Sequence, residues 1–308
     1  MSEASAKYRL RSDLRNLFIL GDLSLPAYLV VGAEKTALID AGMTYMAPRY
    51  VEDMENILGG GKGPDYLLYT HSHFDHVGGT PHLLNRFPEM ELCGHDYLFK
   101  VLGREKARAS IEELSRKMAV RFAPENDLTE SDFDFSVIKP GRALNDGDAV
   151  DLGGGITIEV IHTPGHTNDS VSYFIDHLKA VATGEALGIP HGGDLYVAPE
   201  FLSSFNEYIE SIEKVRKKRP EIILLGHQMI VQNKDVDRFF KNGLKHSFEL
   251  RDKIKRYIKE SGLNVESVVE TIKEEEYVSL REGKQPEEAY LLNLRAQVRL
   301  IARELSGD

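Results

Sequence analysis

Short apolar runs alternate with helical patterns along the first two thirds of the chain. Runs of apolar residues bounded by turn residues predict strands at 16–20, 27–31, 36–40, 66–70, 156–161, 171–175, 179–183 and 221–225. Apolar residues spaced three and four apart predict helices at 48–58, directly after Gly79, at 103–120 and at 205–215. Residues 127–140 are acidic and irregular. This alternation predicts a mixed α/β body.

Beyond Asn233 the strand patterns stop. Apolar residues there recur at helical spacing, as in the series Leu291, Leu294, Val298, Ile301 and Leu305. Charged clusters such as 273–276 are typical of solvated helix faces. The sequence therefore predicts a helical extension whose apolar stripes need a partner surface to be buried.

Composition and charge narrow the range of functions. The 308 residues are 42% hydrophobic and 28% charged, which is ordinary for a globular protein. A formal net charge of -11 disfavours nucleic acid as a partner, because phosphate contacts need clusters of lysine and arginine. No apolar run approaches the roughly 18 residues of a spanning helix. Residues 1–10 contain no apolar leader segment, so we expect a cytoplasmic protein without a membrane partner.

Cysteine usage excludes two further kinds of site. The only cysteine is Cys93, so neither an intramolecular disulfide nor a zinc cluster built on cysteines is possible. We expect Cys93 to be a small buried residue near the end of a strand.

The densest group of chemically active side chains follows the predicted strand at 66–70. It holds four potential metal ligands: His71, His73, Asp75 and His76. If the segment is an extended loop, alternation places the first three on one side. A single histidine is more often a surface residue or a satisfied core residue. Three imidazoles and a carboxylate within six residues suit Zn²⁺ or Fe²⁺ instead, and they are costly to bury without partners.

Other candidates also stand at the ends of predicted strands, where loops commonly carry functional residues: His166, Glu185, His227 and Asp40. The turn made by Pro164 and Gly165 would aim His166 at the site. We expect Asp40 to orient the histidine loop through hydrogen bonds. His162 is interpreted as a strand residue.

Taken in order, these motifs resemble the metallo-β-lactamase superfamily. The resemblance covers about residues 15–231 and rests on THSHFDHVGG at 70–79, TPGHT at 163–167, TGEA at 183–186 and the Gly-His pair at 226–227. It implies an α/β fold, the αββα sandwich, with two metal ions between the sheets. The long helical C-terminus is similar to that of the quinolone-signal-pathway thioesterase and related acyl thioesterases. We therefore expect a metal-binding domain at 1–232 and a helical extension at 233–308 that caps the active-site cleft.

The resemblance also implies a ligand set. One metal would be held by His71, His73 and His166, and the other by Asp75, His76 and His227. Glu185 occupies the position where the family commonly has a bridging aspartate, although relatives such as alkylsulfatases bridge with glutamate. We expect two divalent metal ions, zinc first, with iron or manganese as alternatives. If Glu185 points away, one metal is expected, and a nearby carboxylate such as Asp194 would substitute.

The expected reaction is hydrolysis by a metal-activated hydroxide. Two close divalent metals lower the pKa of a shared water and polarise a carbonyl or phosphoryl oxygen. Asp75 is the candidate catalytic group, because it could relay the proton. No convincing Ser-His-Asp or cysteine nucleophile is found in the sequence. The expected substrate is a small molecule, an acyl thioester or hydrophobic ester with a hydrophobic acyl part.

Other functions stay open at this point. A lactonase or a phosphoesterase would use the same centre. A mononuclear-iron sulfur dioxygenase is a redox alternative, because such enzymes have a similar fold with a single iron. The flavodiiron proteins use the fold with two irons, but His73 and the helical tail argue against that type. A regulatory protein with vestigial activity and a homodimer are also compatible with the sequence.

Overall fold

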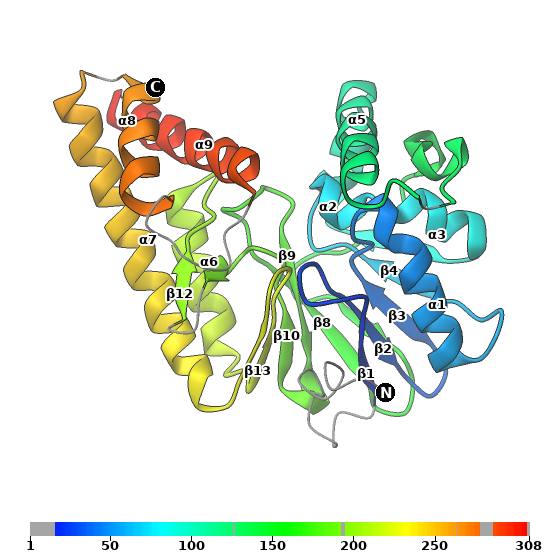
Figure 1. The fold of residues 1–308 in the computed structure, drawn as a ribbon. Coiled ribbons are helices and arrows are strands. Elements are labelled where there is room, and N and C mark those ends of the chain that lie inside the picture. The colour runs from blue at the N-terminus through cyan, green and yellow to red at the C-terminus, as the bar shows by residue number, and fades with distance from the viewer. Residues whose placement is uncertain (1–15, 126, 192–194, 263, 278–285, 307–308) are drawn as a thin grey trace.

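Two six-stranded sheets form the centre of the molecule (Figure 1). The computed structural model describes residues 16–306 except 126, 192–194, 263 and 278–285, so Asp194 lies outside the described residues. The first sheet has the order β1-β2-β3-β4-β5-β6, with β1 to β3 antiparallel and β3 to β6 parallel. Its strands are β1 (Leu17–Leu20), β2 (Ala27–Val31), β3 (Thr36–Ile39), β4 (Tyr66–Leu68), β5 (Glu91–Gly94) and β6 (Arg142–Ala143).

The second sheet has the order β14-β13-β10-β9-β8-β7, and only its β10–β13 pair is parallel. Its strands are β7 (Ala149–Asp151), β8 (Thr157–His162), β9 (Val171–Ile175), β10 (Ala180–Ala182), β13 (Ile222–Leu224) and β14 (Ile230–Gln232). A separate hairpin pairs β11 (Ile189–His191) with β12 (Tyr196–Ala198). The central strands β9, β10 and β13 are buried along their whole length, which explains their continuous apolar sequences.

The two sheets pack face to face. Their inner side chains form one core, in which Ile39 and Leu68 of the first sheet meet Val160 and Tyr173 of the second. Hydrogen bonds also cross this interface, because the Tyr173 hydroxyl donates to the carbonyl of Tyr69 at 2.7 Å. The Tyr28 hydroxyl likewise donates to the carbonyl of Leu225, directly after β13 of the second sheet. The ends of strands from both sheets are thereby held in fixed register.

Helices cover both outer faces. Those on the first sheet are α1 (Ala47–Leu58), α2 (Phe74–Val77), α3 (Thr80–Arg86), α4 (Asp96–Leu102) and α5 (Glu105–Phe122), and α6 (Phe205–Lys217) lies on the second. Short 3₁₀ turns occur at Thr44–Met46, Glu130–Phe133, Phe135–Val137 and Asp176–Leu178. The layers follow the order helix, sheet, sheet, helix, which confirms the predicted αββα sandwich.

The C-terminal extension consists of α7 (Lys234–Glu260), α8 (Val265–Ile272), a π-helical turn at Lys273–Tyr277 and α9 (Glu287–Ser306). Its buried residues, such as Ile254 and Val298, share a continuous core with Phe201 and Tyr208 of the body. In Figure 1, α8 and α9 rise beside the second sheet at the same end of the molecule as α5. Within the described residues, no helix combines the length and apolar composition needed to cross a membrane.

Most predicted elements are present within about two residues of their expected bounds, an uncertainty usual for such assignments. The helix predicted at 103–120 is instead preceded by a second helix, because Gly103 ends α4 and α5 starts at Glu105. The short strands β5, β6, β7, β11, β12 and β14 were not predicted, since two to four residues give too little periodicity. Cys93 is buried in β5, as expected.

Candidate metal centre

The histidine-rich segment begins shortly after β4, which ends at Leu68, and turns into a helix. His71 follows the strand end, whereas His73 precedes α2, which contains Asp75 and His76. The amides of His76 and Val77 both donate to the carbonyl of His73, at 3.0 and 3.1 Å. The prediction of an extended loop up to Asp75 was therefore wrong. A single helical turn, and not the alternation of side chains along an extended loop, brings these ligands together.

Seven side chains converge from four places in the sequence. Ligand atoms within 4.8 Å of one another form three overlapping groups: His71, His73 and His166; His71, His76 and Glu185; and Asp75, His76 and His227. Every candidate ligand singled out in the sequence belongs to at least one group. Loops after β4, β8, β10 and β13 supply them, so the pairing of the two sheets brings the groups together.

Glu185 lies between the two histidine groups. Its Oε2 is 3.1 Å from Nε2 of His71 and 3.7 Å from Nε2 of His166. Its Oε1 is 3.0 Å from Nε2 of both His76 and His227. Each carboxylate oxygen thus faces a different group, so Glu185 does not point away from the site.

Several buried polar atoms of this cluster have no hydrogen-bond partner among the residues that the structure describes. They are Nε2 of His71, Nε2 of His76 and both carboxylate oxygens of Glu185. The atoms approach one another closely, but their angles do not make hydrogen bonds. Because such groups are costly to bury unpartnered, their convergence fits a cation held between them. Imidazole and carboxylate donors also suit zinc, iron or manganese.

The electrostatics divide the histidines into two kinds. Burial, reinforced by neighbouring histidines, holds the pKa of His71 well below its usual range and lowers the pKa of His166 to about 3. These two rings are neutral at physiological pH and offer a free lone pair. Burial alone would also lower the pKa of His76 and His227. The adjacent carboxylates reverse this effect and raise the pKa of His227 to about 10.

The pKa values of the two carboxylates, Asp75 and Glu185, are lowered by the neighbouring histidines. Burial alone would raise the pKa of Asp75, but the charges of His76 and His227 lower it to about 2. The charge of His76 likewise holds the pKa of Glu185 well below its usual range. Both carboxylates are therefore ionised at neutral pH and favour positive charge beside them.

Hydrogen bonds on the far side of the rings fix their orientation. The predicted role of Asp40 is present: its carboxylate accepts from the Thr70 amide at 2.8 Å and from Nδ1 of His76 at 2.9 Å. Nδ1 of His166 donates to the Glu200 carbonyl at 2.7 Å, and Nδ1 of His227 donates to the Ser24 carbonyl at 3.1 Å. Neither Glu200 nor Ser24 was predicted from the sequence, because a backbone carbonyl carries no residue-type signal.

His162 lies outside the three groups, as its interpretation as a strand residue requires. It is the last residue of β8, and its ring stacks on His95 with 4.4 Å between centroids. Its backbone amide donates to Asp146 at 2.9 Å.

Comparison with known proteins shows the family. Residues 20–227 match the family model described as metallo-beta-lactamase superfamily. A metallo-beta-lactamase fold-containing protein of Sulfurisphaera tokodaii is 24% identical over 220 residues, covering 70% of this chain and 77% of that protein. An acyl-coenzyme A thioesterase of Gallus gallus is 27% identical over 208 residues, covering 65% of this chain and 71% of that protein.

A solved structure shows the same architecture. A metallo-beta-lactamase family protein of Thermus thermophilus superposes with a TM-score of 0.63 at 16% identity, and the match covers 96% of this chain and 95% of that one. The match includes most of the C-terminal extension, so this similarity supports the fold of the whole chain.

Proposed function

The chain belongs to the metallo-beta-lactamase superfamily, and we propose that it is a metal-dependent hydrolase of ester-type bonds, with an acyl thioester or hydrophobic ester as substrate. The observation that carries this proposal is the position of Glu185, whose two oxygens face separate histidine groups. The thioesterase name of the Gallus gallus relative favours a thioester over other ester-type bonds.

Two divalent metal ions fit the residues present. We assign one group to His71, His73 and His166 and the other to Asp75, His76 and His227, with Glu185 between them. Zinc is our first expectation, with iron or manganese as alternatives. When bound, such ions would supply a low-pKa water as nucleophile and polarise the scissile carbonyl.

Asp75 is the carboxylate we propose to handle the proton. Its side chain is 18% exposed, compared with 5% for Glu185, so it is the acidic group that a substrate reaches more readily. Its Oδ2 lies 3.4 Å from Nε2 of His227 and 3.8 Å from Nε2 of His76. These neighbours hold the carboxylate in place, so that Oδ2 would accept the proton lost by the attacking water and pass it to the leaving group.

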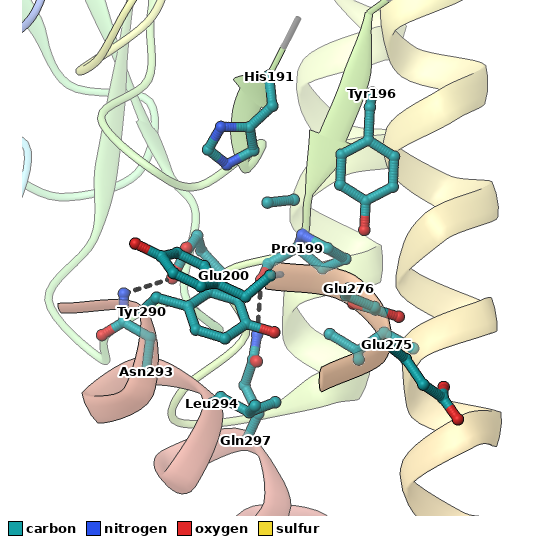
Figure 2. A pocket seen from close by; sticks show the side chains of 13 residues that line it. His191, Tyr196, Pro199, Glu200, Glu275, Glu276, Tyr290, Asn293, Leu294 and Gln297 are labelled. Carbon is teal, nitrogen blue, oxygen red and sulfur yellow. Dashed lines mark hydrogen bonds between the residues drawn. The ribbon is translucent and has the colours of Figure 1, made fainter. Parts of the chain in front are cut away.

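A cavity beside the extension supports a hydrophobic acyl part. It has a volume of about 200 Å³ and lies between α9, α7 and the β11–β12 hairpin (Figure 2). Tyr196, Leu250, Tyr290 and Leu294 form an apolar part of its wall, whereas Glu275 and Glu276 line another part. Glu200 also lines it, and the carbonyl of this residue holds His166. We therefore propose that residues 233–308 cap the cleft of the domain at 1–232 and contribute to acyl binding.

Hydrolysis and metal content should be measured together. Purified chain would be analysed for metal and assayed on matched acyl thioesters, lactones and phosphoesters of increasing acyl length. We expect thioester cleavage that is lost after chelation, restored by Zn²⁺, and abolished in Glu185→Ala. If the chain holds stoichiometric metal but cleaves only lactones or phosphoesters, the proposed substrate class is wrong. A chain with no stoichiometric metal would overturn the mechanism.

An oxygen-uptake assay with a persulfide substrate addresses the redox alternative. We expect no metal-dependent oxygen consumption by the iron-loaded chain. Consumption that saturates with persulfide, without thioester cleavage, would replace the hydrolase by a sulfur dioxygenase.

A further inference from the structure

We propose that helix α9 positions the metal centre: Asn293 and Gln297 hold the Pro199–Glu200 segment, and the carbonyl of Glu200 sets the orientation of His166. The inference rests on the proposed role of His166 as a ligand. Asn293 and Gln297 are positioning residues, because neither belongs to the three ligand groups.

The first step is the bond that fixes the imidazole. Nδ1 of His166 lies 2.7 Å from the Glu200 carbonyl, which can only accept, so Nδ1 must carry the proton. Nε2 is then the lone-pair nitrogen, and it faces Nδ1 of His73 at 3.1 Å and Oε2 of Glu185 at 3.7 Å. The position of one carbonyl oxygen therefore decides which nitrogen of His166 is available to a metal and where it points.

The second step is what holds that carbonyl. Glu200 lies between β12 and α6, so no strand or helix ladder fixes it. Gln297 donates its side-chain amide to the Pro199 carbonyl at 2.5 Å, and Asn293 donates to Oε2 of Glu200 at 2.8 Å. The Glu200 amide donates to the Tyr208 hydroxyl at 3.2 Å. Figure 2 shows Gln297 reaching from α9 to the Pro199 carbonyl and Asn293 reaching to the Glu200 side chain.

The third step is that α9 itself is firmly anchored. Asn293 and Gln297 are one helical turn apart, so they project from the same face. Leu294, Val298 and Ile301 of the same helix are fully buried in the core shared with the body. Gln297 and Glu200 are each only 3% exposed, so water cannot easily replace the lost bonds. Gln297 is thereby coupled to His166 of the metal centre, although the two residues are 131 positions apart in the sequence.

The test compares isosteric variants with a matched control. Gln297→Met and Asn293→Leu remove the amide donors while keeping the size of the side chain. Asn242→Leu is the control, because Asn242 of α7 also donates an amide to a backbone carbonyl, that of Leu195, at 2.7 Å. Zn²⁺ affinity would be measured by competition with a chelator, and the histidine tautomers by ¹⁵N NMR of the metal-free chain.

We expect Gln297→Met and Asn293→Leu to weaken Zn²⁺ binding at one site by about tenfold or more. The spectrum of His166 should shift from a single Nδ1–H tautomer to a mixture, while Asn242→Leu retains native values for both. Unchanged affinity and tautomer in the two α9 variants would overturn the proposal, as would an equal loss in Asn242→Leu. If Gln297→Met does not fold, Asn293→Leu decides alone. The tautomer measurement needs no substrate or metal, so a failure of the proposed hydrolase leaves its result readable.

Discussion

His76 donates a hydrogen bond from Nδ1 to the carboxylate of Asp40 at 2.9 Å, and this bond directs Nε2 towards Glu185. Asp40 reaches this position in a left-handed backbone conformation, with φ of 62° at the end of β3. Aspartate and asparagine tolerate that conformation better than most residues. The strand end thus places a buried carboxylate behind a ring of the candidate metal centre.

Asp40→Asn should weaken metal binding without unfolding the chain. Asparagine accepts the same backbone conformation, but it lacks the negative charge that holds the proton on Nδ1 of His76. We expect about a tenfold to hundredfold loss of Zn²⁺ affinity in chelator competition. Asp65→Asn is the control, because Asp65 also accepts from a backbone amide, that of Thr36, at 2.8 Å. An equal loss of affinity in Asp65→Asn would contradict a specific role for Asp40.

The substitution Glu185→Ala should lower the metal stoichiometry. A carboxylate between two cations offsets their repulsion, so its removal should reduce binding from two equivalents to about one. Glu185→Asp should retain two equivalents and measurable hydrolysis, with a changed metal separation. Titration of the metal-free protein, followed by elemental analysis, measures both. Equal stoichiometry in native protein and Glu185→Ala, with unchanged turnover, would show that Glu185 is not a ligand.

Metal binding should release protons. The pKa of His76 is raised and that of His227 is raised to about 10, so both rings are charged in the metal-free fold at neutral pH. Their charge stabilises the metal-free fold below the usual histidine pKa, and this stabilisation is lost as pH rises through about 10. A metal must displace these protons, so its apparent affinity should rise with pH over this interval.

Calorimetry in buffers of different ionisation enthalpy measures this release. At pH 7 we expect about two protons per chain when both sites fill, one from each charged histidine. Binding heats that are independent of the buffer would contradict the assignment. Replacing His227 by Gln should lower the released number by about one, because that ring no longer carries a proton.

Gly226→Ala should disturb the centre although residue 226 is not a ligand. A Cβ at this position would lie 2.5 Å from Oε1 of Glu185 and 3.0 Å from Cε1 of His76. Glutamate is longer than the usual aspartate, and the absence of a side chain at Gly226 provides its space. We expect loss of at least one metal equivalent. Gly60→Ala is the matched control, since a Cβ there meets nothing within 4 Å. Native metal content in Gly226→Ala would show that Glu185 can move without consequence.

The sequence by itself determined most of the longer elements and the residues that meet at the candidate centre, and the resemblance of its motifs to a known family implied the sandwich. Each candidate carries a local signal, because it follows a short apolar strand or a Pro-Gly turn. Strand ends in a sheet lie at a common edge, so residues such as His166 and His227 were predicted to converge. The helical extension was equally evident, since its apolar residues repeat at helical spacing over many turns.

The tertiary structure alone decided how those residues are held. The direction of the Glu185 oxygens depends on the packing of loops from different strands, and the helical turn at α2 depends on backbone bonds to His73. The contacts of Gln297 with the Pro199 carbonyl and of Asn293 with the Glu200 side chain join segments more than ninety residues apart. A backbone carbonyl can be supplied by any residue type, so no pattern along the chain could reveal which peptide orients His166.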